Sequence, residues 1–110
     1  MIETIEQTCE CVQAQLDRWR GGNARLWEFT PSHDTLTLRV FADDRPGNLH
    51  VVCAACLRLE TPVFWENCKL HLDFEETREC RQLFHLKDEK ADFHVTCRLV
   101  GIEENVEPLY

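Results

Sequence analysis

The stretch from Leu49 to Phe74 constrains the fold more than any other part of this sequence. Apolar or small residues occupy every second position twice in succession, first at odd and then at even numbers. The first set is Leu49, Val51, Cys53, Ala55, Leu57 and Leu59, and the second is Cys68, Leu70, Leu72 and Phe74. A period of two is typical of β-strands with one buried face, so the stretch predicts two strands joined by the loop 61–67.

An amphipathic helix is predicted at the N-terminus. Apolar residues recur there every three or four positions, which places Ile2, Ile5, Cys9, Val12, Leu16 and Trp19 on one stripe. The two glycines at positions 21 and 22 supply a helix stop. We expect a helix over about residues 2–20 that packs on its own sheet. A coiled-coil seam is the alternative, although fewer than three heptads is short for one.

Further alternating segments extend the β pattern over about residues 24–100. We expect strands at 25–30 and 35–41, and a last hairpin formed by 80–87 and 92–100. The residues over 101–110 are acidic and are expected to form a frayed tail. The sequence thus predicts a single α+β domain over 1–110, in which the helix packs on an antiparallel sheet of five to six strands, mostly a meander.

Composition limits the class of protein. A chain of 110 residues with 44% hydrophobic residues suits one globular domain. The net charge of −8 disfavours nucleic acid and anionic membranes as partners, because both are bound by a basic surface. There is no apolar run of membrane-spanning length and no signal-peptide pattern, so we expect a soluble cytoplasmic protein.

The seven cysteines are interpreted as reduced thiols, because they are spread over elements that also carry a normal core. The pair Cys53 and Cys56 has the CxxC spacing of zinc and thiol–disulfide sites, which need the two sulfurs to converge. Residues three apart on a continuous strand point to opposite faces. We therefore expect Cys53 to be buried and Cys56 to face outward, with no disulfide between them and no zinc or other cofactor.

Four of the five histidines, His50, His71, His85 and His94, are expected to share the polar outer face of the sheet. A tight turn at Glu89-Lys90 would place Lys87 opposite Asp92 and His85 directly opposite His94. In the central hairpin, Arg58 would pair with Lys69 and Cys56 with His71, or this pairing shifts by two, and Arg39 would lie near His50. Solvated polar residues are the first interpretation. A weak metal site drawing on His85, His94, Cys56 and His71 is the alternative, although the histidine pair lacks an assured third ligand.

The loop 61–67 carries two adjacent aromatic residues, Phe64 and Trp65. They anchor a partner in one interpretation, since aromatic residues dominate binding hot spots, and cap the core in the other. With His50 and Arg58 on the outer face, they form the candidate interaction residues.

The sequence favours a small acidic non-catalytic binding protein whose partner is another protein or a second copy of the chain. Bacterial toxin-neutralising immunity proteins are often of this size, charge and fold class, so that role is one instance. A metal- or thiol-dependent protein that uses the cysteines and histidines of the outer face is the alternative.

Overall fold

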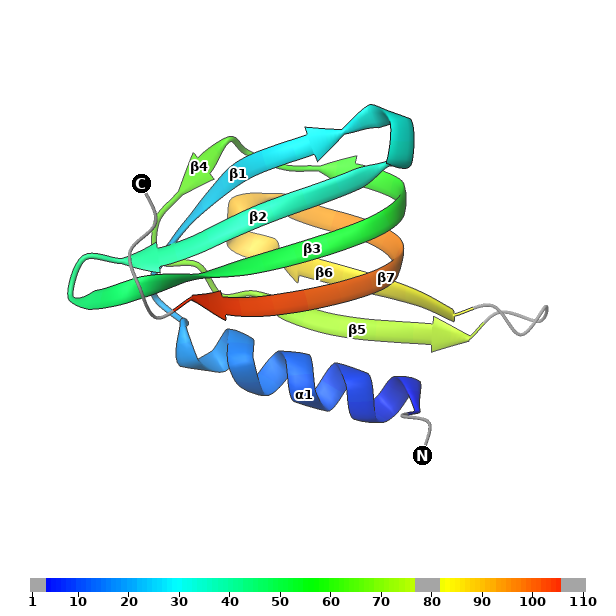
Figure 1. The fold of residues 1–110 in the computed structure, drawn as a ribbon, viewed down its shortest axis with the longest axis horizontal. Coiled ribbons are helices and arrows are strands. Elements are labelled where there is room, and N and C mark those ends of the chain that lie inside the picture. The colour runs from blue at the N-terminus through cyan, green and yellow to red at the C-terminus, as the bar shows by residue number, and fades with distance from the viewer. Residues whose placement is uncertain (1–3, 77–81, 106–110) are drawn as a thin grey trace.

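Helix α1 (Ile5–Arg18) begins at a capping box in the computed structural model, which describes residues 4–76 and 82–105. The Thr4 hydroxyl accepts the backbone N–H of Gln7, and the Gln7 side chain accepts the backbone N–H of Thr4. The helix buries Ile5, Cys9, Val12 and Leu16, which is the stripe that the sequence predicts. It packs mainly along one edge strand of the sheet (Figure 1).

Seven strands of the described residues form one antiparallel sheet, so the fold is α+β as predicted. The strands are β1 (Asn23–Thr30), β2 (Thr35–Ala42), β3 (Arg45–Glu60), β4 (Phe64–Trp65), β5 (His71–Glu76), β6 (Gln82–Asp88) and β7 (Phe93–Asn105). Their order in the sheet is β4-β1-β2-β3-β7-β6-β5. Two three-stranded meanders, β1–β2–β3 and β5–β6–β7, are therefore joined by the pairing of β3 with β7. The sequence predicts five to six strands, which is too few, because β4 lies within the segment 61–67 that was expected to be a loop.

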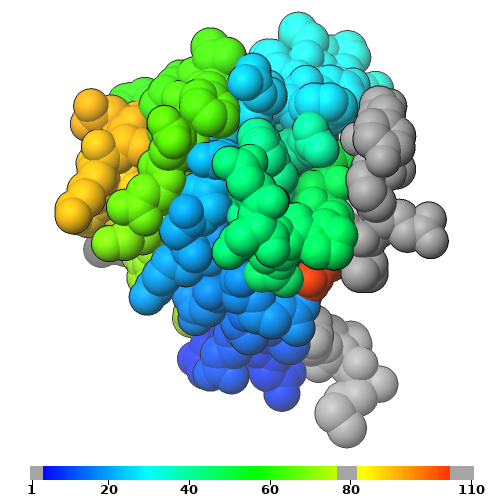
Figure 2. Space-filling view, turned by 90° about the vertical axis from the view of Figure 1, so that its left-hand side faces the viewer, coloured from blue at the N-terminus to red at the C-terminus, as the bar shows by residue number. Residues whose placement is uncertain are grey.

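The prediction that residues 49–60 and 68–74 pair as a central hairpin is wrong. Strand β3 pairs with β7, so Arg58 lies opposite Thr96 rather than Lys69, and Cys56 lies opposite Cys97 rather than His71. The chain after β3 instead crosses to β1, where β4 pairs with Ala24 and Arg25. The backbone of Cys68 then bonds to Gly21 and Gly22 before β5 begins. Figure 2 shows this end of the molecule, where the segment after α1 lies beside the chain that follows β4.

Strand β7 extends further than expected. Its C-terminal half stays paired with β3 through Ile102, Glu103 and Glu104, because β3 is 16 residues long and offers partners as far as Asn48. The first half of the expected acidic tail is thus strand. The rest of that tail and Cys80 lie outside the described residues.

Strands β3 and β7 both curve sharply where they cross the bend of the sheet (Figure 1). Ala55 has a left-handed backbone with φ 54°, and the register with β7 shifts between Cys56 and Arg58. This irregularity changes which side chains of β3 face inward. Cys56 therefore packs against the core together with Cys53, which corrects the expectation that it faces outward.

One core fills the inside of the curved sheet and the space under α1. It contains apolar residues of the helix and both meanders, including Leu36, Leu38, Val51, Leu72, Leu86, Phe93 and Val95. Among the described residues, no helix is both long and apolar enough to cross a membrane.

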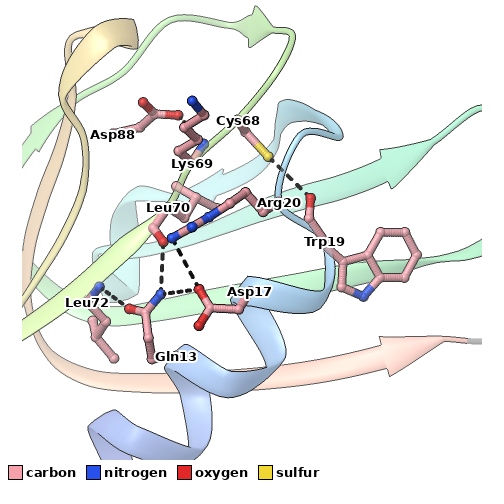
Figure 3. A network of polar contacts seen from close by, with 9 residues as sticks. All are labelled: Gln13, Asp17, Trp19, Arg20, Cys68, Lys69, Leu70, Leu72 and Asp88. Atoms are coloured by element: carbon pink, nitrogen blue, oxygen red, sulfur yellow. Dashed lines mark hydrogen bonds and ion pairs between the residues drawn. The ribbon is translucent and has the colours of Figure 1, made fainter.

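The exposed edge of β5 is covered by a side chain of the helix. Gln13 donates to the carbonyl of Leu70 over 3.1 Å and accepts the backbone N–H of Leu72 over 2.8 Å (Figure 3). A glutamine amide has the same donor and acceptor as a peptide group, so it continues the hydrogen-bond ladder by one step. Such cover prevents the edge from pairing with another chain.

Candidate functional site

A row of side chains crosses the outer face of the sheet over five strands. The register places Phe64 of β4 beside Arg25 of β1, Arg25 beside Arg39 of β2, Arg39 beside His50 of β3, and His50 beside Glu103 of β7. Directly paired residues of neighbouring strands share one face. We call this set, with the flanking residues Trp27 and Phe41, the aromatic–arginine row.

Stacked rings and guanidinium groups hold the row together. The guanidinium carbon of Arg39 lies 5.0 Å from the ring centroid of Trp27 and 5.1 Å from that of Phe41. That of Arg25 lies 4.9 Å from the ring centroid of Phe64. Trp27 and Phe64 remain 51% and 39% exposed, so the row presents aromatic surface to solvent. Trp, Phe and Arg side chains in this arrangement are typical of binding surfaces.

The row places two positive charges side by side. Arg25 and Arg39 lie directly opposite each other, and neither forms an ion pair with a described residue. Like charges in directly opposite positions of a sheet are destabilising. An anionic group placed between them would relieve that repulsion.

His50 lies in the row between Arg39 and Glu103, and next to Trp27 at a ring-centroid distance of 6.3 Å. Burial lowers the pKa of His50 below its usual value, and the Arg39 charge lowers it further, while Glu103 acts in the opposite direction. Its buried Nε2 has no hydrogen-bond partner among the described residues. The imidazole is therefore favoured in its neutral form.

Sequence reasoning found only part of this row. Phe64 and His50 were candidates, whereas Arg25, Trp27 and Arg39 were not. Trp27 follows the alternation that puts Arg25 on the outer face, whereas the bulge between Leu26 and Glu28 separates it from Phe29, which lies opposite the buried Leu36. The alternation over 35–41 predicts Arg39 near His50, and the structure confirms this pairing. It was the sequence signal from which the row could have been found.

Trp65 belongs to the core, which is the second of the two interpretations given for the loop 61–67. Its side chain is 9% exposed, packs on Phe93 with ring centroids 5.0 Å apart, and donates through Nε1 to the buried Asp88 over 2.9 Å. Because β4 pairs with β1, Phe64 and Trp65 point to opposite faces. The loop 61–67 therefore supplies one core residue and one surface residue.

Three histidines, His71, His85 and His94, lie on another part of the outer face, in two parallel rows of side chains. The first row runs His71, Lys87, His94, Glu60, and the second runs Asp73, His85, Thr96, Arg58. Within the set, Arg58 forms an ion pair with Glu60, and His71 Nε2 lies 3.1 Å from Asp73 Oδ1. A shallow cavity of about 290 Å³ lies beside them, lined by Lys69, His71, Asp73, Lys87 and Glu89.

His85 and His94 contact each other, although not in the expected register. His85 pairs with Thr96, so His94 lies on the diagonal, with His85 Nδ1 and His94 Nε2 3.2 Å apart. The turn is a three-residue 3₁₀ segment, η2 (Glu89–Ala91), followed by Asp92 at φ 55°, and this shifts the pairing by two residues. Burial lowers the pKa of His94, and nearby Arg58, Lys87 and His85 lower it further, against Glu60.

The thiols of β3 and β7 form a separate buried cluster. Cys53 and Cys97 are fully buried, and Cys56 donates to the carbonyl of Cys53 over 3.2 Å. Burial raises the pKa of Cys56 to about 11. No disulfide forms within residues 4–76 and 82–105. Thiolate chemistry is therefore disfavoured at Cys56.

Within the same described ranges, no group of three or more His, Cys, Asp or Glu side chains is arranged to hold a metal ion. Cys56 lies on the inner side and His71 bonds to Asp73, so the four metal candidates do not converge. Only His85 and His94 come together.

Comparisons with profiles of protein families, with curated proteins and with solved structures give no match. The surface chemistry of the chain itself is thus the basis for any functional proposal.

Proposed function

We propose that the protein is a non-catalytic binding protein that docks a protein partner through the aromatic–arginine row. The observation that carries this proposal is the pair of opposed arginines, Arg25 and Arg39, each stacked on exposed aromatic rings and neither neutralised by a described residue. A fold that keeps two like charges adjacent at some loss of stability favours an anionic partner group.

The partner surface that fits this row presents carboxylates beside apolar side chains. Carboxylates accept the N–H groups of Arg25 and Arg39, while apolar groups cover Trp27 and Phe64. Covering the row removes water from the guanidinium–ring stacks, and such contacts strengthen from about 0.5–1 kcal/mol at exposed sites to about 2 kcal/mol when desolvated. Neutralisation of a partner, as in immunity-type proteins, is one instance of this function.

The test compares three single variants of the full chain in quantitative affinity capture from cells of the source organism. Trp27→Ala and Arg39→Ala truncate the row, and Arg58→Ala removes an exposed arginine outside it, whose side chain is engaged by Glu60. A specific partner is recovered by the unmodified chain and by Arg58→Ala, and lost by both row variants. With that partner purified, each row variant weakens binding about 30-fold, which corresponds to about 2 kcal/mol.

Three results would contradict the proposal. Proteins recovered equally by all variants would show that the row is not the binding surface. A dimer of the chain that dissociates in Arg39→Ala would replace the heterologous partner by a second copy. Binding of a single-stranded oligonucleotide that is lost in the row variants would replace protein by nucleic acid.

A further inference from the structure

The histidine rows contain three donor atoms that surround one point. His85 Nδ1 and His94 Nε2 lie 3.2 Å apart, and the Thr96 hydroxyl oxygen lies 3.1 Å from the first and 3.5 Å from the second. Donor atoms at the corners of a tetrahedron are about 3.3 Å apart when each is about 2.05 Å from zinc. The three atoms thus have the mutual spacing of one face of a tetrahedral site.

A carboxylate behind the first histidine orients it for this geometry. His85 Nε2 lies 2.9 Å from Glu75 Oε1. Because the carboxylate only accepts hydrogen bonds, Nε2 carries the proton and Nδ1 directs its lone pair toward His94 and Thr96. Pairs of carboxylate and histidine are the usual second shell of protein zinc sites.

We propose that His85, His94 and Thr96 bind a divalent transition-metal ion, with zinc as the best match, at an open and exchangeable site on the outer face of the sheet. The ion takes the position between the two imidazoles, and water completes its coordination. The third donor is a hydroxyl group, so the site differs from the sets of three or more His, Cys, Asp and Glu that usually hold zinc.

The surrounding charges make this a labile site rather than a structural one. Lys87 and Arg58 oppose a cation, whereas Glu60 and Glu75 favour it. Lys87 and Glu60 lie opposite His94, Arg58 lies opposite Thr96, and Glu75 contacts His85. The His85 side chain is 22% exposed, so an ion can enter from solvent. The site stands independently of the aromatic–arginine row, which lies on other strand segments.

The test is a titration with Zn²⁺ of the full chain in a Cys11→Ser, Cys80→Ser background, which removes one exposed thiol and one outside the described residues. Binding is measured by calorimetry, and the histidine ring signals are followed by NMR. We expect one equivalent of Zn²⁺ to shift the signals of His85 and His94. His85→Gln and His94→Gln each lower the affinity at least tenfold, Thr96→Val and Glu75→Gln lower it less, and His71→Gln leaves it unchanged.

Circular dichroism of each metal-free variant separates loss of the site from loss of the fold. A folded His94→Gln variant that binds Zn²⁺ as tightly as the unmodified chain would overturn the proposal. So would a titration in which the signals of His71 move before those of His85 and His94, or in which no equivalent of zinc binds.

Discussion

The indole Nε1 of Trp65 donates a hydrogen bond to Oδ2 of the buried Asp88, and the same oxygen accepts the backbone N–H of Lys69 over 2.8 Å. One carboxyl oxygen therefore fixes the end of β4 and the approach to β5 against the end of β6. Phe64, the neighbour of Trp65, lies on the opposite face and stacks with Arg25. The two aromatic residues of this segment consequently have different roles.

Truncation of these two residues should have unequal effects on stability. Trp65→Ala removes a buried aromatic side chain and leaves Asp88 without one donor, so we expect a loss of about 3–5 kcal/mol in the free energy of unfolding. Phe64→Ala removes a surface ring and should cost about 1 kcal/mol or less. Urea denaturation followed by circular dichroism measures both values. Equal losses would mean that Phe64 is also part of the core.

Gln13 should control the edge of β5. Gln13→Ala removes the two hydrogen bonds to the backbone of Leu70 and Leu72, so we expect a loss of about 1–2 kcal/mol and faster exchange of the Leu72 amide proton. The matched control is Gln15→Ala. Gln15 lies on the same helix, and its side chain forms no hydrogen bond with a described residue, so this substitution should change stability by about 0.5 kcal/mol or less. Unfolding in urea and amide exchange by NMR provide the measurements. If both variants lose the same stability, the hydrogen bonds between Gln13 and the edge of β5 make no net contribution to the free energy of unfolding.

The sequence predicts those elements whose signals are periodic. The helix stripe from Ile5 to Leu16 and the alternation around Leu36, Val51 and Leu72 are all found in the core. These signals are local, since each needs only the spacing of residues along one element. These signals predict a helix on an antiparallel sheet and place four of the five histidines on the polar face of that sheet.

Three of the wrong predictions concern the direction of Cys56, the strand β4 and the partner of β3, and each rests on a feature that has no local signal in the sequence. The left-handed backbone of Ala55 reverses the direction of Cys56, and alanine gives no indication of such a conformation. The two-residue strand β4 is too short to show a period. The pairing of β3 with β7 joins residues 34 to 57 positions apart, whereas the sequence prediction paired each strand with its nearest neighbour along the chain.

Turn chemistry explains the shifted histidine register. The turns before β2 and β7 are both three-residue 3₁₀ segments that end at an aspartate in the left-handed region, Asp34 at φ 48° and Asp92 at φ 55°. Aspartate tolerates this region better than most residues. The repeated pattern, an Asp one residue before a strand, was the available signal.

The thiols should react in an order set by burial. At neutral pH the exposed Cys11 is expected to react with iodoacetamide first, whereas Cys56 reacts slowly because burial raises its pKa to about 11. The fully buried Cys53 and Cys97 should react only on unfolding. Mass spectrometry of the native protein over time, with Cys80 replaced by serine, gives the order. Rapid labelling of Cys56 would show that β3 does not turn it inward.

His50 should make the stability of the protein depend on pH. Its pKa is lowered in the folded state, mainly by burial and further by the Arg39 charge, so between that lowered value and about 6.5 the unfolded chain binds more protons than the folded one. Stability that His50 contributes at neutral pH is therefore lost as the pH falls below about 6.5. His50→Gln removes this contribution, so the variant should lose less stability than the unmodified chain between pH 7.5 and 5.5.

The comparison between these two proteins isolates His50 from the other titrating groups. The pKa of His94 is also lowered, and its effect has the same sign, but it is present in both proteins and cancels in the difference. Urea denaturation at pH 7.5, 6.5 and 5.5 gives the free energy of unfolding for each. Parallel curves would show that His50 has the same proton affinity in the folded and unfolded states. A steeper loss in His50→Gln would reverse the sign of the effect and contradict the partial burial of the imidazole beside Trp27.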